Sequence, residues 1–311
     1  MQFDDYAQFL PPEYRERARL RPAATWWEWR GRRVHIARAA APDAGVRVLV
    51  LHGGGGHVGA LWPLAAAVVP DGVELLAVDL PLYGATDEPR PRAVRYGDWV
   101  DLVCDLVRAE TERDRRPLVL FGASMGGMLA YEASSRTGAV AHVLTTCLLD
   151  PADPAARRAA ARTPAAARMA PALAALEPVL GGVMVPIRLL GDLRAMSTNR
   201  ELARYCARDP RGGGARVPLG FMSSFLSYAH TAPARYTGAP VTLVHPAADA
   251  WTPPELSLRV LRRIAAPTEV VMLPESGHFP VERPGLDQLA ATVLRLRDTV
   301  QPVSRSTSAT S

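Results

Sequence analysis

One serine of this chain stands in a pattern that can make it a nucleophile. Residues 122–127 read Gly-Ala-Ser-Met-Gly-Gly; they follow the apolar run PLVLF and precede the helical run MLAYEASSR. In a G-x-S-x-G pattern of this kind, small neighbours permit a sharp strand-to-helix turn that exposes the serine hydroxyl. A serine hydroxyl is a weak nucleophile at neutral pH, so it needs a base that a third group orients. We therefore predict that Ser124 attacks a substrate carbonyl with the help of a downstream base and acid.

The strongest candidate for the base is His278. It follows the apolar run EVVMLP within the segment ESGHFP and precedes a proline-led helical segment. This position predicts a loop just after the last strand, where an imidazole can reach the turn that carries Ser124. A single histidine can also be structural, and His57 is the next candidate.

The acid is predicted to be Asp249, which lies in VTLVHPAADAWTPP at the end of an apolar run. Asp150 ends the run HVLTTCLLD and is the competing candidate. It can equally cap a helix that begins near Pro151, which favours Asp249. Asp79 precedes the nucleophile in the chain and is expected to be structural.

A tetrahedral intermediate needs two backbone N–H groups directed at its oxyanion. Met125 is expected to provide one from the turn after Ser124. The segment HGGGGH at 52–57 follows the run RVLVL, and its bare backbone indicates Gly54 as the second donor, with Gly55 as the alternative. The segment lacks the G-K-[ST] ending of a phosphate-binding P-loop and the features of a dinucleotide site. We expect no metal and no organic cofactor.

The elements that must position these residues follow from the hydrophobic pattern. Short Val- and Leu-rich runs alternate with helical segments such as the stripe from Trp99 to Val107, which predicts the α/β class with a mostly parallel sheet flanked by helices. The predicted strands are 47–52, 73–80, 117–122, 142–149, 240–245 and 269–274. An antiparallel hairpin is expected around Gly31. Its three tryptophans are expected to pack in the core: Trp26, Trp27 and Trp29.

The alternation of strands and helices is interrupted once. Residues 1–150 and 237–300 are predicted to form the two parts of one core, and the Ala-, Arg- and Pro-rich stretch 151–236 a helical cap. Apolar residues of this stretch indicate a lipophilic acyl group: Met196, Phe221, Met222 and Phe225. The Ser/Thr-rich tail 301–311 is predicted to be disordered.

The composition of the chain limits the classes of binding partner that we expect. The 311 residues carry a net charge of +5, but all 36 basic residues are arginines scattered among acids, so we expect no nucleic-acid binding. Cys104, Cys147 and Cys206 lie in apolar segments and are predicted to be buried thiols in a reducing cytoplasm. The early acids of the N-terminus do not resemble a signal peptide, and no apolar run reaches the length for stable membrane insertion. A small-molecule acyl substrate is expected, and the oligomeric state stays open.

Taken in order, these motifs resemble the α/β-hydrolase superfamily from about Trp26 to Val300. They are HGGGG, DLPLYGATDEP, GASMGG, an acid followed by a proline-containing loop, and GHFPVERP. The Ser-Met-Gly-Gly turn is similar to that of esterases, monoacylglycerol lipases and lactonases. The stretch 151–236 is similar to the cap of lysophospholipase-like and monoacylglycerol-lipase-like hydrolases. The resemblance implies the α/β-hydrolase fold with a helical cap.

The resemblance further implies a serine hydrolase that cleaves a carboxylic ester through an acyl-serine intermediate. A lipophilic ester such as a monoacylglycerol or a lysophospholipid is the expected substrate. The same three residues would also serve a thioesterase, an acyltransferase, a lactonase or a C–C bond hydrolase. A ligand receptor without enzymatic activity is the remaining alternative.

Overall fold

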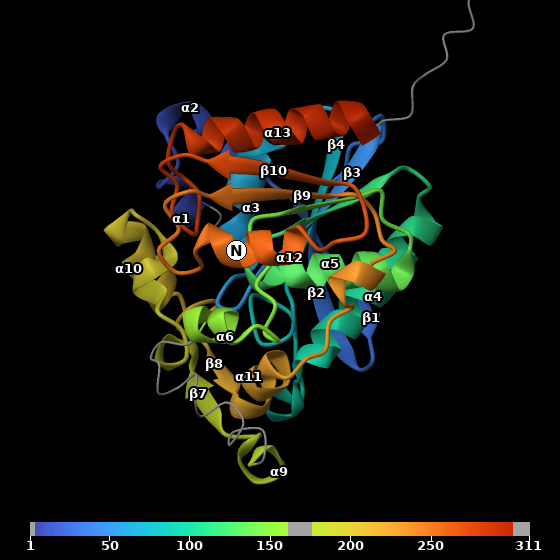
Figure 1. Cartoon of the computed structure of the whole chain (residues 1–311). Helices are drawn as coiled ribbons and strands as arrows, with labels where there is room; N and C mark the ends of the chain where they lie inside the picture. Colours follow the sequence, from blue (N-terminus) through green and yellow to red (C-terminus); the bar gives the residue numbers. More distant parts are fainter. Residues whose placement is uncertain (1–3, 161–175, 301–311) are drawn as a thin grey trace, which may run out of the picture.

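The computed structural model describes residues 4–160 and 176–300, which contain an eight-stranded sheet (Figure 1). The strands lie in the order β1-β2-β4-β3-β5-β6-β9-β10. From β4 to β10 all neighbours are parallel, whereas β2 is antiparallel to both β1 and β4. Their bounds are β1 Ala23–Trp29, β2 Arg32–Ala39, β3 Val46–Leu51, β4 Val73–Val78, β5 Leu118–Gly122, β6 His142–Thr145, β9 Val241–Pro246 and β10 Thr268–Leu273. The predicted mostly parallel sheet flanked by helices is confirmed.

Helices cover both faces of the sheet because successive side chains of each strand point to opposite faces. In β3, Val48 and Val50 pack in one hydrophobic cluster, and Leu49 and Leu51 pack in another. The first cluster contains residues of α3 (Val58–Val68) and α13 (Gly285–Val300). The second contains residues of α4 (Tyr96–Arg113), α5 (Met125–Thr137) and α12 (Pro254–Leu261). The short helices near the N-terminus are α1 Asp4–Ala7, α2 Pro12–Arg15 and the 3-10 turn η1 Arg17–Arg19.

The predicted strands all fall on strands of the sheet, and the largest difference in length is that of β6. β6 ends at Thr145, four residues before the predicted end. The Thr145 hydroxyl donates to the carbonyl of Cys147 and accepts from its amide. This local turn takes the place of the hydrogen bonds between strands that would continue β6. Strand β6 therefore stops where the chain leaves toward the stretch 151–236.

The hairpin expected around Gly31 is present as β1 and β2. Arg30 and Gly31 have φ of 48° and 76°, as a tight hairpin turn requires. The prediction that all three tryptophans pack in the core was wrong for Trp26, which is 45% exposed. Its ring contacts the Arg33 guanidinium, 4.8 Å from the ring centroid, and the His35 ring, whose centroid lies 5.3 Å away. Trp26 lies on β1, the edge strand, whose outer face has no covering layer.

Within the described part of the stretch 151–236, no strand joins the eight-stranded sheet. Two short strands instead form a separate antiparallel pair, which adds a small sheet to the expected helices. Its elements are α6 Pro154–Ala160, α9 Glu177–Leu180, β7 Met184–Pro186, η3 Ile187–Leu189, η4 Leu193–Met196, α10 Arg200–Arg208, β8 Arg216–Pro218, α11 Leu219–Leu226 and η5 Pro233–Arg235. Figure 1 shows most of them gathered beyond one end of the sheet. The tail 301–311, predicted to be disordered, lies outside the described residues.

Candidate active site

The site lies where four parallel strands of the same sheet end. The loops after β3, β5, β9 and β10 carry the glycine-rich segment 53–56, Ser124, Asp249 and His278. Because parallel strands end at the same edge of a sheet, these loops share one crevice although they are far apart in the sequence. The structure thus brings together the five residues that the sequence put first for catalysis: Gly54, Ser124, Met125, Asp249 and His278.

Ser124 occupies a strained turn between β5 and α5. Its φ of 55° and ψ of −124° lie in a region that costs a non-glycine residue roughly 1–3 kcal/mol. The next helix can approach the sheet only because two residues lack side chains. A Cβ on Gly126 would lie 2.3 Å from the Leu51 carbonyl oxygen, and a Cβ on Gly127 would lie 2.0 Å from that of Cys147. The turn places the serine hydroxyl within hydrogen-bond distance of His278.

His278 connects the serine to the acid. Its Nε2 lies 2.8 Å from Ser124 Oγ, and its Nδ1 lies 2.7 Å from Asp249 Oδ2. The carboxylate accepts, so Nδ1 carries the proton of the neutral ring and Nε2 accepts from the serine hydroxyl. His278 and Asp249 are only 6% and 5% exposed, which keeps both hydrogen bonds out of bulk water. The arrangement can take the proton of Ser124 as its oxygen attacks a carbonyl.

Asp249 is held by its own loop. Its Oδ1 accepts from the amides of Trp251 and Thr252 at 2.8 and 2.9 Å, and its Oδ2 also accepts from the Thr252 hydroxyl at 2.7 Å. Burial by itself would raise the pKa of Asp249, but His278 and the hydrogen bonds from Thr252 hold this pKa below its usual range. The carboxylate therefore stays ionised beside the imidazole.

Sequence reasoning missed Thr252 and Trp251. The Thr252 hydroxyl lies 3.2 Å from His278 Nδ1, and the Trp251 ring lies with its centroid 5.0 Å from that of His278. A signal was present, because an aspartate that bonds the amides two and three residues later is typical of a local turn in segments such as Asp-Ala-Trp-Thr.

The competing acid has another role. Asp150 accepts from the amide of Ala152, within its own turn. The helix expected near Pro151 begins at Pro154, and Asp153 accepts from an amide of its first turn. Asp150 therefore does not cap this helix, because the helix begins at Pro154 and not near Pro151.

Asp79 is fully buried and structural, as expected. Its Oδ1 accepts from the Val58 amide at 2.7 Å. Its Oδ2 accepts from His35 and from the Ala85 amide at 2.8 and 2.9 Å. It thereby ties the start of α3 to the loop after β4.

The two predicted amide donors flank the serine. Met125 is the first residue of α5, and Gly54 lines the space next to Ser124 on the facing loop. A Cβ on Gly54 would meet the Met125 side chain at 3.5 Å, so the two residues lie against each other. Within residues 4–160 and 176–300, neither amide donates to another protein group. Gly55, the alternative donor, has φ of 78° and faces Gly213 instead.

Two apolar cavities meet at Gly54 and Ser124. One, of about 60 Å³, extends toward Leu61, Leu64 and Met196. The other, of about 70 Å³, is lined by residues that include Leu190, Met222 and Phe225. Phe221 lines neither cavity; it packs in the core with its ring 4.7 Å from that of Trp99.

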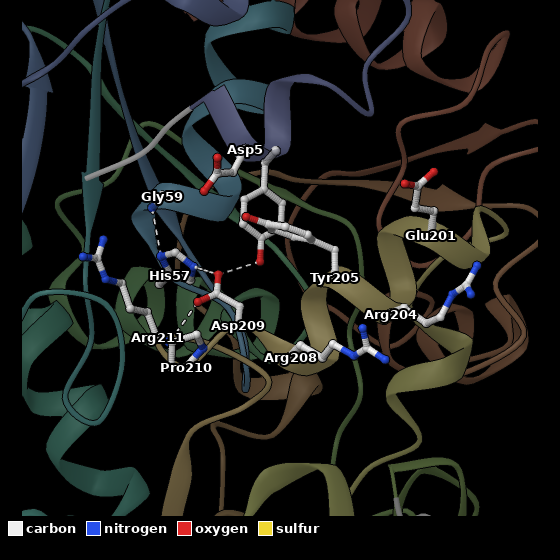
Figure 2. Close-up of a pocket in the computed structure, with 11 residues that line it drawn as sticks. Asp5, His57, Gly59, Glu201, Arg204, Tyr205, Arg208, Asp209, Pro210 and Arg211 are labelled. Carbon is white, nitrogen blue, oxygen red and sulfur yellow. Dashed lines mark hydrogen bonds and ion pairs between the residues drawn. The ribbon is translucent and has the colours of Figure 1, made fainter.

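His57, the alternative base, is engaged elsewhere. Its Nδ1 accepts from the Gly59 amide, so Nε2 carries the proton and donates to Asp209 Oδ2 over 2.7 Å. The Tyr6 hydroxyl donates to the same oxygen at 2.8 Å. These groups line a surface cavity of about 820 Å³ (Figure 2). The sequence held no local signal for this network, whose members come from α1, the loop after β3 and the end of α10.

The structure also tests the cysteines, possible metal sites and possible membrane spans. The three cysteines are free and buried, as predicted. In residues 4–160 and 176–300 no cluster of three His, Cys, Asp or Glu side chains is arranged to hold a metal. None of the helices in these ranges combines the length and the apolar character needed to cross a bilayer.

The sequence matches a model of the alpha/beta hydrolase family over residues 48–291. The comparison with curated proteins found no match. Among solved structures, the monoacylglycerol lipase of Paleococcus ferrophilus is similar, with a TM-score of 0.68 and 22% identity over 85% of this chain and 98% of the lipase.

Two further structures have the same fold. A soluble variant of monoglyceride lipase from Saccharomyces cerevisiae gives a TM-score of 0.71 and 15% identity over 91% of this chain and 97% of its own. A thermostable carboxyl esterase from Bacillus coagulans gives a TM-score of 0.71 and 14% identity over 91% of this chain and 100% of the esterase. At these identities the likeness establishes the fold.

Proposed function

Because the chain belongs to the alpha/beta hydrolase family, we propose that it is a serine hydrolase that cleaves a carboxylic ester through an acyl-Ser124 intermediate. The observation that supports this most strongly is the continuous line of hydrogen bonds from Ser124 through His278 to Asp249. A serine at a strained turn, bonded to a buried histidine whose far nitrogen faces a carboxylate, has the requirements of an activated nucleophile.

In the first half of the proposed reaction, Ser124 Oγ attacks the ester carbonyl and His278 Nε2 takes its proton. Asp249 stabilises the imidazolium that forms, since the pKa of its carboxyl lies below the usual range and the group remains charged. The amides of Met125 and Gly54 donate to the oxyanion. The C–O bond to the alcohol then breaks, and His278 returns the proton to the leaving oxygen.

In the second half, a water molecule replaces the alcohol. His278 takes a proton from the water, and the hydroxide attacks the acyl carbonyl of the Ser124 ester. The tetrahedral intermediate uses the same amide donors. Collapse of this intermediate releases the carboxylic acid and returns the proton to Ser124 Oγ.

The apolar lining of both cavities next to Ser124 supports a lipophilic acyl group. We take a monoacylglycerol or a lysophospholipid as the substrate, in line with the lipases among the similar structures. The stretch 151–236 acts as a cap over a core formed by 1–150 and 237–300, because its residues Met196, Met222 and Phe225 close the cavities. Three free, buried thiols fit a cytoplasmic protein.

Turnover of a substrate panel by the pure protein tests the proposal. Monoacylglycerols, lysophospholipids, p-nitrophenyl esters and lactones are compared, with fluorophosphonate labelling as an independent measure of the nucleophile. We expect ester hydrolysis and labelling at Ser124. An unlabelled protein without turnover on any ester would contradict the proposal and favour a ligand receptor.

A further inference from the structure

Helix α10 carries two adjacent stripes of different charge. Its first stripe is basic and repeats every four residues: Arg200, Arg204 and Arg208. The second follows one residue later and is acidic at both ends: Glu201, Tyr205 and Asp209. Residues four apart are neighbours on a helix surface, so each series lies along one line. Figure 2 shows Arg204 and Arg208 projecting away from the His57–Asp209 pair.

A surface groove of about 770 Å³ lies beside the basic stripe. Its apolar lining consists of Leu193, Ala203 and Ala207. Its charged lining consists of one acid and five bases: Asp192, Arg188, Arg194, Arg200, Arg204 and Arg208. The cavity of Figure 2, in contrast, has three acids and three arginines in its lining. The groove is therefore the strongly positive surface of the two.

Four of the five arginines of this groove form no ion pair with a carboxylate in the described part of the chain. Asp192 Oδ1 accepts from the Arg194 amide, and no ion pair joins a carboxylate to the side chains of Arg194, Arg200, Arg204 or Arg208. Elsewhere arginines pair with acids: Arg113 lies 2.9 Å from Glu110. Like charges four residues apart destabilise a helix, so the stripe is unfavourable unless an anion offsets it.

The groove lies next to the proposed catalytic cavity. Leu193 lines the groove and also the cavity that contains Ser124 and Met125. Leu193 is 4% exposed and contributes to the lining of both spaces. A substrate at Ser124 whose leaving group extends past Leu193 would bring that group to the arginines.

Resting on the function proposed above, we propose that the groove binds a phosphate group on the leaving-group side of the acyl substrate. Guanidinium groups bind phosphate through paired, charge-assisted hydrogen bonds. Side chains four residues apart on a helix stand about 6 Å apart, a distance that one phosphate can bridge. The substrate class is a phosphate-bearing acyl ester or thioester, such as an acylglycerol phosphate or an acyl-coenzyme A, in preference to a neutral monoacylglycerol.

The test uses the double variant Arg200→Gln/Arg204→Gln. The matched control is Arg262→Gln/Arg263→Gln, which removes the same charge from exposed positions after α12. Each protein is assayed on an acylglycerol 3-phosphate, an acyl-coenzyme A and a monoacylglycerol with the same acyl chain. We expect kcat/KM for a phosphate-bearing substrate to fall by about tenfold or more in the groove variant only. The monoacylglycerol rate should be unchanged, and the two phosphate-bearing substrates distinguish an ester from a thioester.

A binding measurement separates this inference from the proposed function. Glycerol 3-phosphate and inorganic pyrophosphate are titrated into wild type and both double variants by calorimetry. Binding that only the groove variant loses supports the phosphate site even if no ester is turned over. Ester turnover without phosphate binding or phosphate preference overturns the inference and leaves the proposed hydrolase intact.

Two further outcomes would also overturn it. A groove variant that loses activity equally on neutral and phosphate-bearing substrates would show general damage to the cap. Binding to phosphatidylglycerol vesicles, without binding of either small phosphate, would assign the arginines to a membrane surface.

Discussion

The imidazole of His57 donates to the Asp209 carboxylate over 2.7 Å and thereby links the glycine-rich loop after β3 to the end of α10. The same carboxylate oxygen accepts from Tyr6. Burial by itself would raise the pKa of Asp209, but the His57 hydrogen bond and the neighbouring donors lower this pKa to about 2. The N-terminal helix, the proposed oxyanion loop and the cap thus share one acceptor.

Asp209→Asn should therefore lower the free energy of unfolding at pH 7, by about 1–3 kcal/mol. Because the folded pKa lies below the unfolded value of about 3.9, the charge contributes stability above that pH and loses it as pH falls toward about 2. Urea unfolding as a function of pH measures the difference. Asp192→Asn, on the exposed part of the cap, is the control. If the variant stays less stable than wild type by the same free energy of unfolding below the folded pKa of Asp209, the loss of stability would come from lost packing and not from the lost charge.

Ser124→Ala should abolish ester turnover and fluorophosphonate labelling while the protein stays folded. The substitution removes the attacking oxygen but keeps a Cβ at the strained turn, so the backbone requirement is unchanged. Intact-protein mass spectrometry reads the label, and the melting temperature reports the fold. Labelling that survives in the variant would place the nucleophile elsewhere.

His278→Gln should lower kcat by several orders of magnitude, because within residues 4–160 and 176–300 His278 is the one base bonded to the Ser124 hydroxyl. His142→Gln is the matched control, since His142 bonds Thr242 on the neighbouring strand. Turnover numbers for both variants decide the point. Activity near that of wild type in the His278 variant would require a different base.

Asp249→Asn should lower kcat by about 10⁴, because an amide favours the wrong tautomer of His278. Asp150→Asn should have little effect on kcat, because the Asp150 carboxylate accepts from the Ala152 amide within its own turn. Turnover and melting temperature are measured for both. If the Asp249 variant kept its activity and the Asp150 variant lost it, Asp150 and not Asp249 would be the catalytic acid.

The stability of the protein should decline as pH falls from about 6.5 to about 4. Burial lowers the pKa of three histidines to about 4: His52, His142 and His230. In this window the unfolded chain binds more protons, since an unperturbed histidine has a pKa of about 6.5. Each group contributes a slope of up to about 1.4 kcal/mol per pH unit, and above the window its contribution is complete. Urea unfolding at several pH values should give a shallower slope for His142→Gln, whereas an identical slope would contradict this origin.

The sequence by itself determined the local parts of the site. Small residues on both sides of Ser124 permit a sharp turn, and in the structure a Cβ on Gly122, Gly126 or Gly127 would collide with neighbouring backbone. The apolar runs before Ser124, Asp249 and His278 predict strands, and parallel strands bring their following loops to one edge. These are properties of short segments, so spacing and residue type were sufficient.

Only the tertiary structure decided which groups meet across the chain. Asp249 was preferred to Asp150 from its position, but the contact with His278 depends on β9 lying beside β10. Hydrophobic spacing gave no signal for Thr252, which lies next to that contact. It also gave none for the hydrogen-bond network of Tyr6, His57 and Asp209. Side-chain hydrogen bonds act over about 3 Å and depend on how elements pack, whereas hydrophobic patterns report only which face of an element is buried.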